Sequence, residues 1–216
     1  SSSLVGSEMC IRDSSEAQCP AKLVDDALKA FGGLDAVVSN AGITSPAPLI
    51  DLPVSKWDKL LNVNARATLL LAQAAYPALK ESKGALVAVA SMSGMGAHPG
   101  MGAYSPSKAA LISLCQVLAQ EWACDGINVN TVSPGMIRTP LTQKVYENNQ
   151  IARERAALVP WGRVGNPEDI SNVISFLLSP EANYITGQNI LVDGGFVDSL
   201  YRHIPGLPDS SEIDKT

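Results

Sequence analysis

Short apolar runs rich in β-branched residues alternate with longer helical patterns along this chain, and this alternation constrains its fold more than any other feature. The sequence predicts strands at Leu34–Ser39, Ala85–Ala90, Ile127–Val132 and Ile190–Val192. Helical patterns fill the intervals, at about 15–31, 55–81, 103–123, 140–157 and 167–179. Strands joined through helices run parallel, by right-handed crossovers that place helices on both faces of the sheet. The sequence therefore predicts an α/β fold with a doubly wound parallel sheet.

The composition is that of a globular protein that binds a small molecule. Of its 216 residues 46% are hydrophobic and 17% are charged, which is enough apolar material for a sizeable core. The formal net charge is −5 and no basic run occurs, which argues against nucleic acid or an anionic membrane as a partner. No apolar stretch reaches the length that spans a bilayer, so we expect no membrane segment.

Cysteine and histidine give no sign of a metal site. The four cysteines show no C-x-x-C spacing, and the two histidines, His98 and His203, lie far apart in the sequence. We expect neither a metal site nor a disulfide framework. A reducing, cytoplasmic location is the corresponding expectation.

Two polar residues share the apolar face of the helix expected at 103–123. Tyr104 and Lys108 lie one turn apart, on the stripe continued by Leu111, Cys115, Leu118 and Trp122. A lysine on a buried stripe is costly unless its charge is used. A nearby ammonium favours the phenolate, so Lys108 is expected to lower the pKa of Tyr104 and make it a general acid/base.

A serine follows the second predicted strand at the position where ligands bind in such folds. In an open α/β sheet ligands bind beyond the carboxyl ends of the strands, and Ser91 directly follows Ala85–Ala90. The Ser91 hydroxyl could polarise a substrate carbonyl.

At these residues the chain resembles the short-chain dehydrogenase/reductase family. The hallmark Tyr-x-x-x-Lys of that family stands here as Tyr104-Ser105-Pro106-Ser107-Lys108. Order and spacing make the match specific, because the further family motifs follow in series: Asn40-Ala41-Gly42, Asn64, Ser91, Tyr104, Lys108, Pro134-Gly135 and Asp193-Gly194-Gly195. The resemblance runs from about residue 15 to about residue 197 and implies a Rossmann-type fold.

The resemblance implies a catalytic tetrad of Asn64, Ser91, Tyr104 and Lys108. Tyr104 would exchange the substrate proton, and Ser91 would hydrogen-bond the carbonyl oxygen. Lys108 resembles the lysine that lowers the tyrosine pKa and holds the nicotinamide ribose, and Asn64 resembles the residue that links this lysine, through water, to a proton path. The implied reaction is hydride transfer between a secondary alcohol and a ketone.

The implied cofactor is NAD or NADP, which the residues present do not distinguish. By resemblance, the cofactor-binding residues are Asn40, Ala41, Gly42, Tyr104, Lys108, Pro134, Gly135, Ile137 and Thr139. The Pro134-Gly135 turn, with Ile137 and Thr139 beyond it, would back the nicotinamide. A nicotinamide enzyme supplies orientation and a proton, while the hydride chemistry belongs to the cofactor.

The phosphate-binding part of the family pattern is missing. Its Thr-Gly-x-x-x-Gly-x-Gly loop occurs nowhere in the sequence, and the nucleotide-binding half would need about 60 further residues before Asn40. We therefore expect residues 15–216 to be an N-terminally truncated domain with an incomplete sheet, whose bare edge at Leu34–Ser39 invites mispairing. The stretch Ser7–Asp13 resembles translated sequencing-adapter text, so residues 1–14 are predicted to be non-native or disordered.

Simpler interpretations accompany each of these expectations. Tyr104 could be an ordinary helix tyrosine with Lys108 snorkelling to solvent, and His98 could be a solvated loop residue rather than a substrate contact. Gly135 and Gly194 could be turn glycines that need a positive φ.

Two expectations concern the whole protein. The chain could be a catalytically silent remnant or binding module that lacks the dinucleotide phosphate site. The family also implies a homodimer or homotetramer assembled through the helices at 55–81 and 103–123. Substrate specificity is expected in residues 93–102, 140–162 and the tail after Gly195.

Overall fold

A four-stranded parallel sheet organises the molecule, as the alternation of patterns predicts. The computed structural model describes residues 19–204 apart from Leu141. Its strands are β1 (Ala36–Ser39), β2 (Ala85–Val89), β3 (Asn128–Pro134) and β4 (Asn189–Val192), in the order β1-β2-β3-β4. Adjacent strands pair in parallel, with Val37 opposite Leu86 and Val132 opposite Ile190. Residues 1–14 and the start of the first predicted helix lie outside the described residues.

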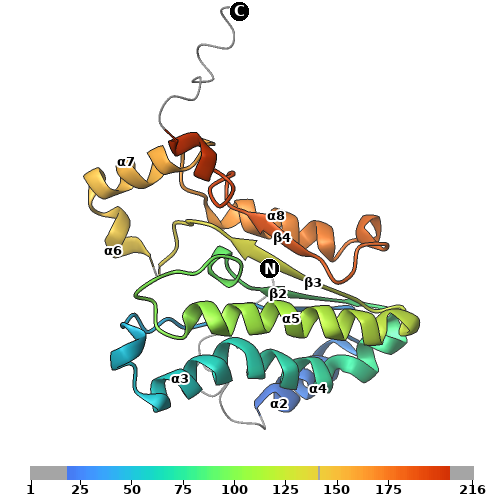
Figure 1. Ribbon diagram of the computed structural model, residues 1–216. Helices are drawn as coiled ribbons and strands as arrows, with labels where there is room; N and C mark the ends of the chain where they lie inside the picture. The colour runs from blue at the N-terminus through green and yellow to red at the C-terminus, as the bar shows by residue number, and fades with distance from the viewer. Residues whose placement is uncertain (1–18, 141, 205–216) are drawn as a thin grey trace, which may run out of the picture. The chain divides into compact units, whose positions relative to one another are not determined.

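The helices lie in the predicted regions, but the regions predicted at 55–81 and 140–157 each contain two helices. They are α2 (Cys19–Phe31), α3 (Val54–Leu61), α4 (Ala67–Ser82), α5 (Tyr104–Trp122), α6 (Gln143–Tyr146), α7 (Asn149–Leu158) and α8 (Pro167–Leu177). Helices α2, α4 and α5 lie on one side of the sheet and α8 lies on the other (Figure 1). The two-sided cover predicted for a doubly wound sheet is confirmed.

The single helix expected at 55–81 is divided. A π-helical segment, Asn62–Arg66, separates α3 from α4, and the backbone stays in the right-handed helical region at both junctions. A bulge of this kind cannot be detected from apolar periodicity, because the apolar side chains before and after it still lie on the buried face. Such bulges occur frequently at functional sites, and this one contains Asn64.

Apolar side chains from the sheet and from one helical layer form the main core. Leu86 and Val129 of the sheet, Leu79 of α4 and Leu111 of α5 are almost completely buried within one cluster. At the far end of α5, the rings of Tyr76 and Trp122 pack with centroids 4.9 Å apart. Helix α5 is therefore packed against the core from Leu111 to Trp122.

The chain divides into two compact units. The first contains the described residues up to Pro134 together with Glu168–Val192, and so holds the whole sheet. The second contains Gly135–Pro167 and the described residues from Asp193 onward. Within the second unit, Tyr146, Ala152 and Val164 form a small apolar cluster with Met136 packed against it.

Strand β1 is the outer strand of the described sheet. It pairs with β2 alone among the strands that the structure describes, and Val38 is 43% exposed. The truncation of the sheet and the mispairing at this strand remain predictions.

Candidate active site

Three of the predicted catalytic side chains come together beyond the carboxyl end of β2. Ser91 lies two residues after β2, Tyr104 is the first residue of α5, and Lys108 lies one turn further along the same helix. Ser91 lies near enough to Tyr104 for its hydroxyl to lower the pKa of the phenol, and the Lys108 Nζ lies 5.9 Å from the centroid of the Tyr104 ring. The arrangement inferred from the spacing of these residues is thus one local cluster.

Lys108 is a buried cation that uses only one of its N–H donors within the described part of the protein. Its side chain is only 3% exposed, and its Nζ donates to the carbonyl oxygen of Val89 at 2.8 Å. Burial lowers the pKa of Lys108 to about 8, because desolvation disfavours the charged form. An ammonium has three N–H donors, and among the described residues this one has a single acceptor. Two donors are left for a ligand that carries hydroxyl groups.

The pKa of Tyr104 moves opposite to the sequence-based expectation. Burial raises the pKa of Tyr104 above its ordinary value, and the hydrogen bond with Ser91 acts in the lowering direction to a smaller extent. Lys108 is not among the groups that shift it. The prediction that Lys108 lowers the pKa of Tyr104 is therefore wrong. The Lys108 ammonium hydrogen-bonds the Val89 carbonyl, and burial of the Tyr104 phenol raises its pKa.

A backbone donor orients the Ser91 hydroxyl. Ser91 caps a short 3-10 turn, Met92–Gly94, and its Oγ accepts a hydrogen bond from the backbone N–H of Ser93 at 3.1 Å. Because Oγ is engaged as an acceptor, the hydroxyl hydrogen remains available to donate. Ser91 can therefore offer its proton to a carbonyl oxygen or to the Tyr104 oxygen.

Asn64 has its side-chain amide fully engaged. Its Oδ1 accepts from the Ile43 N–H at 2.8 Å, and its Nδ2 donates to the Ile43 carbonyl at 3.0 Å and to Ser107 Oγ at 2.9 Å. Asn64 thus fixes the segment that follows Asn40-Ala41-Gly42. A Cβ added at Gly42 would lie 3.3 Å from the Lys108 Nζ, so this loop passes directly over the lysine.

Sequence reasoning missed Ser107, which joins two parts of the site. Ser107 is completely buried, accepts from Asn64 and donates its hydroxyl to the Tyr104 carbonyl at 2.7 Å. The π-helical segment and the first turn of α5 are therefore tied together through this one hydroxyl. A serine inside a helix that bonds back to a carbonyl three residues earlier is a known local pattern, and only the burial of Ser107 distinguishes it from a surface residue.

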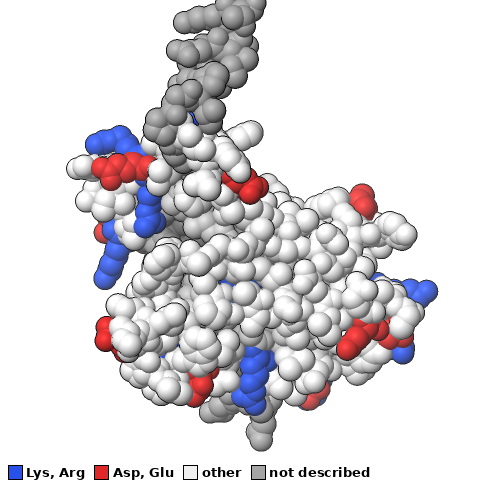
Figure 2. Space-filling view, viewed as in Figure 1, with Lys and Arg blue, Asp and Glu red and all other residues white. Residues whose placement is uncertain are grey.

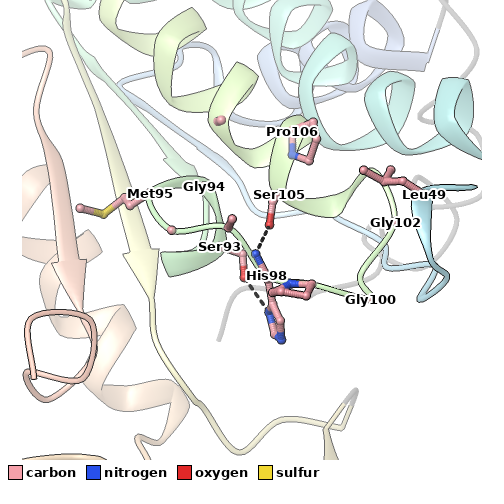
Figure 3. A pocket seen from close by; sticks show the side chains of 13 residues that line it. Leu49, Ser93, Gly94, Met95, His98, Gly100, Gly102, Ser105 and Pro106 are labelled. Atoms are coloured by element: carbon pink, nitrogen blue, oxygen red, sulfur yellow. Dashed lines mark hydrogen bonds between the residues drawn. The ribbon is translucent and has the colours of Figure 1, made fainter. Parts of the chain in front are cut away.

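A pocket of about 400 Å³, shown in Figure 3, is lined by residues that lie close in the sequence to this cluster. The pocket is built from the 93–102 loop, Leu49 and the outer side of the first α5 turns, including Ser105, Pro106 and Ala109. His98 projects at its mouth; its Nδ1 lies 3.1 Å from Ser93 Oγ, and its backbone N–H donates to Ser105 Oγ at 3.2 Å. The pocket is not lined by Ser91, Tyr104 or Lys108. Residues one or two positions away, Ser93, Ser105 and Ala109, do line it.

The predicted nicotinamide-side residues are divided between the two units. Pro134 is the last residue of β3 in the first unit, whereas Gly135, Ile137 and Thr139 belong to the second. A Cβ added at Gly135 would lie 2.5 Å from the Asp193 Cβ, so close packing explains this glycine. Gly194 does adopt a positive φ of 66°. The turn-glycine interpretation therefore applies to Gly194 and not to Gly135.

Two absences hold for the described residues. None of their helices is long and apolar enough to cross a membrane. No group of three or more histidine, cysteine or acidic side chains among them could hold a metal ion.

Comparison with known proteins gives consistent matches over most of the chain. A family model described as enoyl-(acyl carrier protein) reductase matches residues 3–197. A 3-oxoacyl-(acyl-carrier-protein) reductase of Thermotoga maritima is 40% identical over 82% of this chain and 71% of its own length. A (3R)-3-hydroxyacyl-CoA dehydrogenase of Mus musculus is 37% identical over 85% of this chain and 71% of its own length.

A solved structure matches as well. The crystal structure of a short-chain type dehydrogenase/reductase from Mycobacterium marinum superposes with a TM-score of 0.77 at 32% identity, over 85% of this chain and 73% of that one. The chain spans 59% to 71% of the length of the curated relatives it matches.

Proposed function

Because the chain belongs to the short-chain dehydrogenase/reductase family of oxidoreductases, we propose that it interconverts a secondary alcohol and a ketone with Tyr104 as the general acid/base. The observation that carries the proposal is the cluster of Ser91, Tyr104 and Lys108 at the carboxyl end of β2. When bound, the nicotinamide cofactor, NAD or NADP, supplies or takes up the hydride.

The protein's part in the reaction is to hold the carbonyl and to move one proton. In the reducing direction the Ser91 hydroxyl donates a hydrogen bond to the carbonyl oxygen, and Tyr104 delivers its phenolic proton to the same oxygen. The Ser93 N–H supports this by keeping the Ser91 lone pair engaged. Lys108 is charged at neutral pH, because its pKa of about 8 lies above 7, and two of its ammonium hydrogens are left to bind ligand hydroxyl groups.

The residues present fit a nicotinamide ribose at Lys108. The ammonium is buried, has unused donors and is covered by the Gly42 loop, where a side chain would fill the space above Nζ. Asn40, Ala41 and Gly42 would lie against the nucleoside, and Pro134, Gly135, Ile137 and Thr139 would hold the nicotinamide side. Asn64 acts as a positioning residue, since it fixes the backbone of Ile43 and thereby the loop over Lys108.

A ketone or secondary alcohol on an acyl chain suits the chemistry of the site. One relative is named for a 3-oxoacyl group and the other for a 3-hydroxyacyl group, which are a ketone and a secondary alcohol. The pocket lined by the 93–102 loop has apolar walls that include Leu49, Met95 and Ala109, with few polar groups at its mouth. We propose that the 93–102 loop selects the substrate. We also propose a cytoplasmic location for the protein.

A second candidate function is that of a catalytically silent binding module. Two observations favour it for the chain as it stands: the family's glycine-rich phosphate loop is absent from the sequence, and β1 is an outer strand of the described sheet. A protein of this kind would keep the proton-transfer residues without a strong grip on the dinucleotide.

Titration of NADH and NADPH into the 216-residue chain, followed by cofactor fluorescence, separates the two candidates. A submillimolar dissociation constant for either dinucleotide, with turnover of a 3-oxoacyl thioester, supports the oxidoreductase. Tyr104→Phe should then keep the binding and lower kcat by about 10²- to 10⁴-fold, the usual worth of general acid catalysis. The matched control is Tyr184→Phe, because Tyr184 is 99% exposed.

Two results would count against the proposed mechanism. Unchanged turnover in Tyr104→Phe would remove Tyr104 from the reaction. Absence of binding for both dinucleotides would favour the silent module.

A further inference from the structure

The second unit contains a pocket of its own, built around a buried tyrosine. Its volume is about 360 Å³, and it is lined by Arg138, Thr139, Pro140, Gln143, Tyr146 and Glu147. Tyr146 is the last residue of α6 and is only 6% exposed, although it lies next to the exposed Glu147. All of the lining residues belong to the second unit, so the pocket is defined within it.

Two guanidinium groups lie over the ring of Tyr146. The central carbon of Arg138 is 5.2 Å from the ring centroid, and that of Arg155, from α7, is 5.6 Å from it. Both distances are within the range of cation–π attraction. Each guanidinium thus lies within reach of the same ring, and Arg138 also lines the pocket.

Neither guanidinium is neutralised by a carboxylate among residues 19–140 and 142–204, where no ion pair involves Arg138 or Arg155. Glu147 lines the pocket without pairing with either arginine, and the neighbouring Glu154 accepts a hydrogen bond from Gln150 at 2.9 Å. Figure 2 shows basic side chains interspersed with acidic ones over α6 and α7. Two cations over one ring, neither of them paired with a carboxylate, produce a local field that attracts an anion.

The Tyr146 hydroxyl is a second and independent sign of a ligand. It is a buried polar atom that has no hydrogen-bond partner among the described residues. An unsatisfied buried hydroxyl costs about 1–3 kcal/mol, and native structures contain few such groups. A ligand oxygen in the pocket would satisfy it.

We propose that this pocket binds an oxyanion, a phosphate or carboxylate group, through Arg138, Arg155 and the Tyr146 hydroxyl. Arg138 donates directly from the pocket wall, Arg155 supplies a second positive charge across the ring, and the phenol donates its otherwise unused hydrogen. The anionic group belongs either to a free ion or substrate tail, or to the phosphates of the dinucleotide. The site is independent of the proton-transfer cluster and does not require turnover.

The test is calorimetric titration of the full chain with inorganic phosphate, with acetate and with NADH, at constant ionic strength set by chloride. We expect millimolar or tighter binding of phosphate or acetate. Arg138→Gln should weaken this binding by about 5- to 20-fold, the range for losing one charge-assisted donor at a partly exposed site. Arg155→Gln and Tyr146→Phe should weaken it by smaller factors.

Arg153→Gln is the matched control, because Arg153 lies on the same helix as Arg155 and is exposed. It should leave the affinity unchanged. If NADH binding alone responds to Arg138→Gln, the anionic group is that of the dinucleotide; if phosphate or acetate also responds, the site takes a free anion or a substrate tail. No binding of any of the three ligands, or equal losses in the Arg153 control and the Arg138 variant, would overturn the proposal. Circular dichroism of each variant checks that α6 and α7 remain folded.

Discussion

At the scale of single residues, Lys108 combines a chemical role with a cost in stability. Its ammonium is almost completely removed from water, and the Val89 carbonyl compensates only part of the lost hydration. The pKa of Lys108 falls from 10.5 to about 8, and each unit corresponds to about 1.4 kcal/mol, so the burial cost is on the order of 3 kcal/mol. The role proposed for Lys108 in binding and catalysis, rather than fold stability, would account for a lysine at this position.

This cost predicts how stability depends on pH. Below pH 8 the ammonium is charged in both the folded and the unfolded chain, so the full cost is present. Between pH 8 and 10.5 the folded chain has lost the proton that the unfolded chain still binds, and the cost disappears. The unfolding free energy of Lys108→Met relative to the original chain should therefore be most favourable at pH 7 and decline by about 3 kcal/mol towards pH 10.5.

Urea denaturation at a series of pH values measures this difference. Lys144→Met, which alters an exposed lysine, should show no such trend. A pH-independent difference for Lys108→Met would mean that the ammonium is hydrated in the folded chain.

Ser107 gives a second prediction at the same scale. Ser107→Ala leaves one Asn64 amide hydrogen and the Tyr104 carbonyl without their partner, inside a fully buried site. We expect a loss of about 1–3 kcal/mol in unfolding free energy, measured by urea denaturation. Ser113→Ala is the matched control, since Ser113 is exposed on the same helix and its removal should change stability by less than about 0.5 kcal/mol. Equal effects of the two substitutions would contradict the role given to Ser107.

At the scale of secondary structure elements, the period of the apolar residues located nearly every helix and strand. Residues 34–39, 85–90 and 127–132 were predicted as buried strands because they are apolar runs of strand length, and the structure places β1, β2 and β3 there. The same reasoning could not find the π-helical segment at Asn62–Arg66, which changes hydrogen bonding without changing which face is apolar. It also could not find the Asn64–Ser107 contact, which joins residues 43 positions apart.

The turn after β3 carries a prediction about an element junction. A Cβ at Gly135 would stand 2.5 Å from the Asp193 Cβ and 2.7 Å from the Asp193 Cα, so the chain would have to move to accommodate it. We expect Gly135→Ala to destabilise the protein by about 1–3 kcal/mol, as overpacking does. Thermal unfolding measures the effect. Gly33→Ala is the control, because a Cβ at Gly33 meets nothing within 4 Å, and similar melting temperatures for the two variants would refute the close approach.

At the scale of the whole molecule, the exposed side of α5 supports the proposed self-association. Val117 on α5 is 51% exposed, and the family resemblance assigns this helix, with the helical run at 55–81, to a subunit interface. We expect Val117→Glu to shift the protein from dimer or tetramer towards monomer in sedimentation velocity, because an interface buries apolar side chains and excludes charge. Phe176→Glu on α8, where Phe176 is 46% exposed, should leave the sedimentation coefficient unchanged. A monomeric original chain would contradict the proposed assembly.

The division into two units also has a consequence for cleavage of the chain. The backbone passes from one unit to the other three times, after Pro134, before Glu168 and after Val192. Residues 135–167 therefore form an insertion between two segments of the unit that contains the sheet. A protease nick between α6 and α7 would produce two polypeptides that run apart on a denaturing gel, while the folded sheet, with β3 on one polypeptide and β4 on the other, would keep them together as one particle on a native gel.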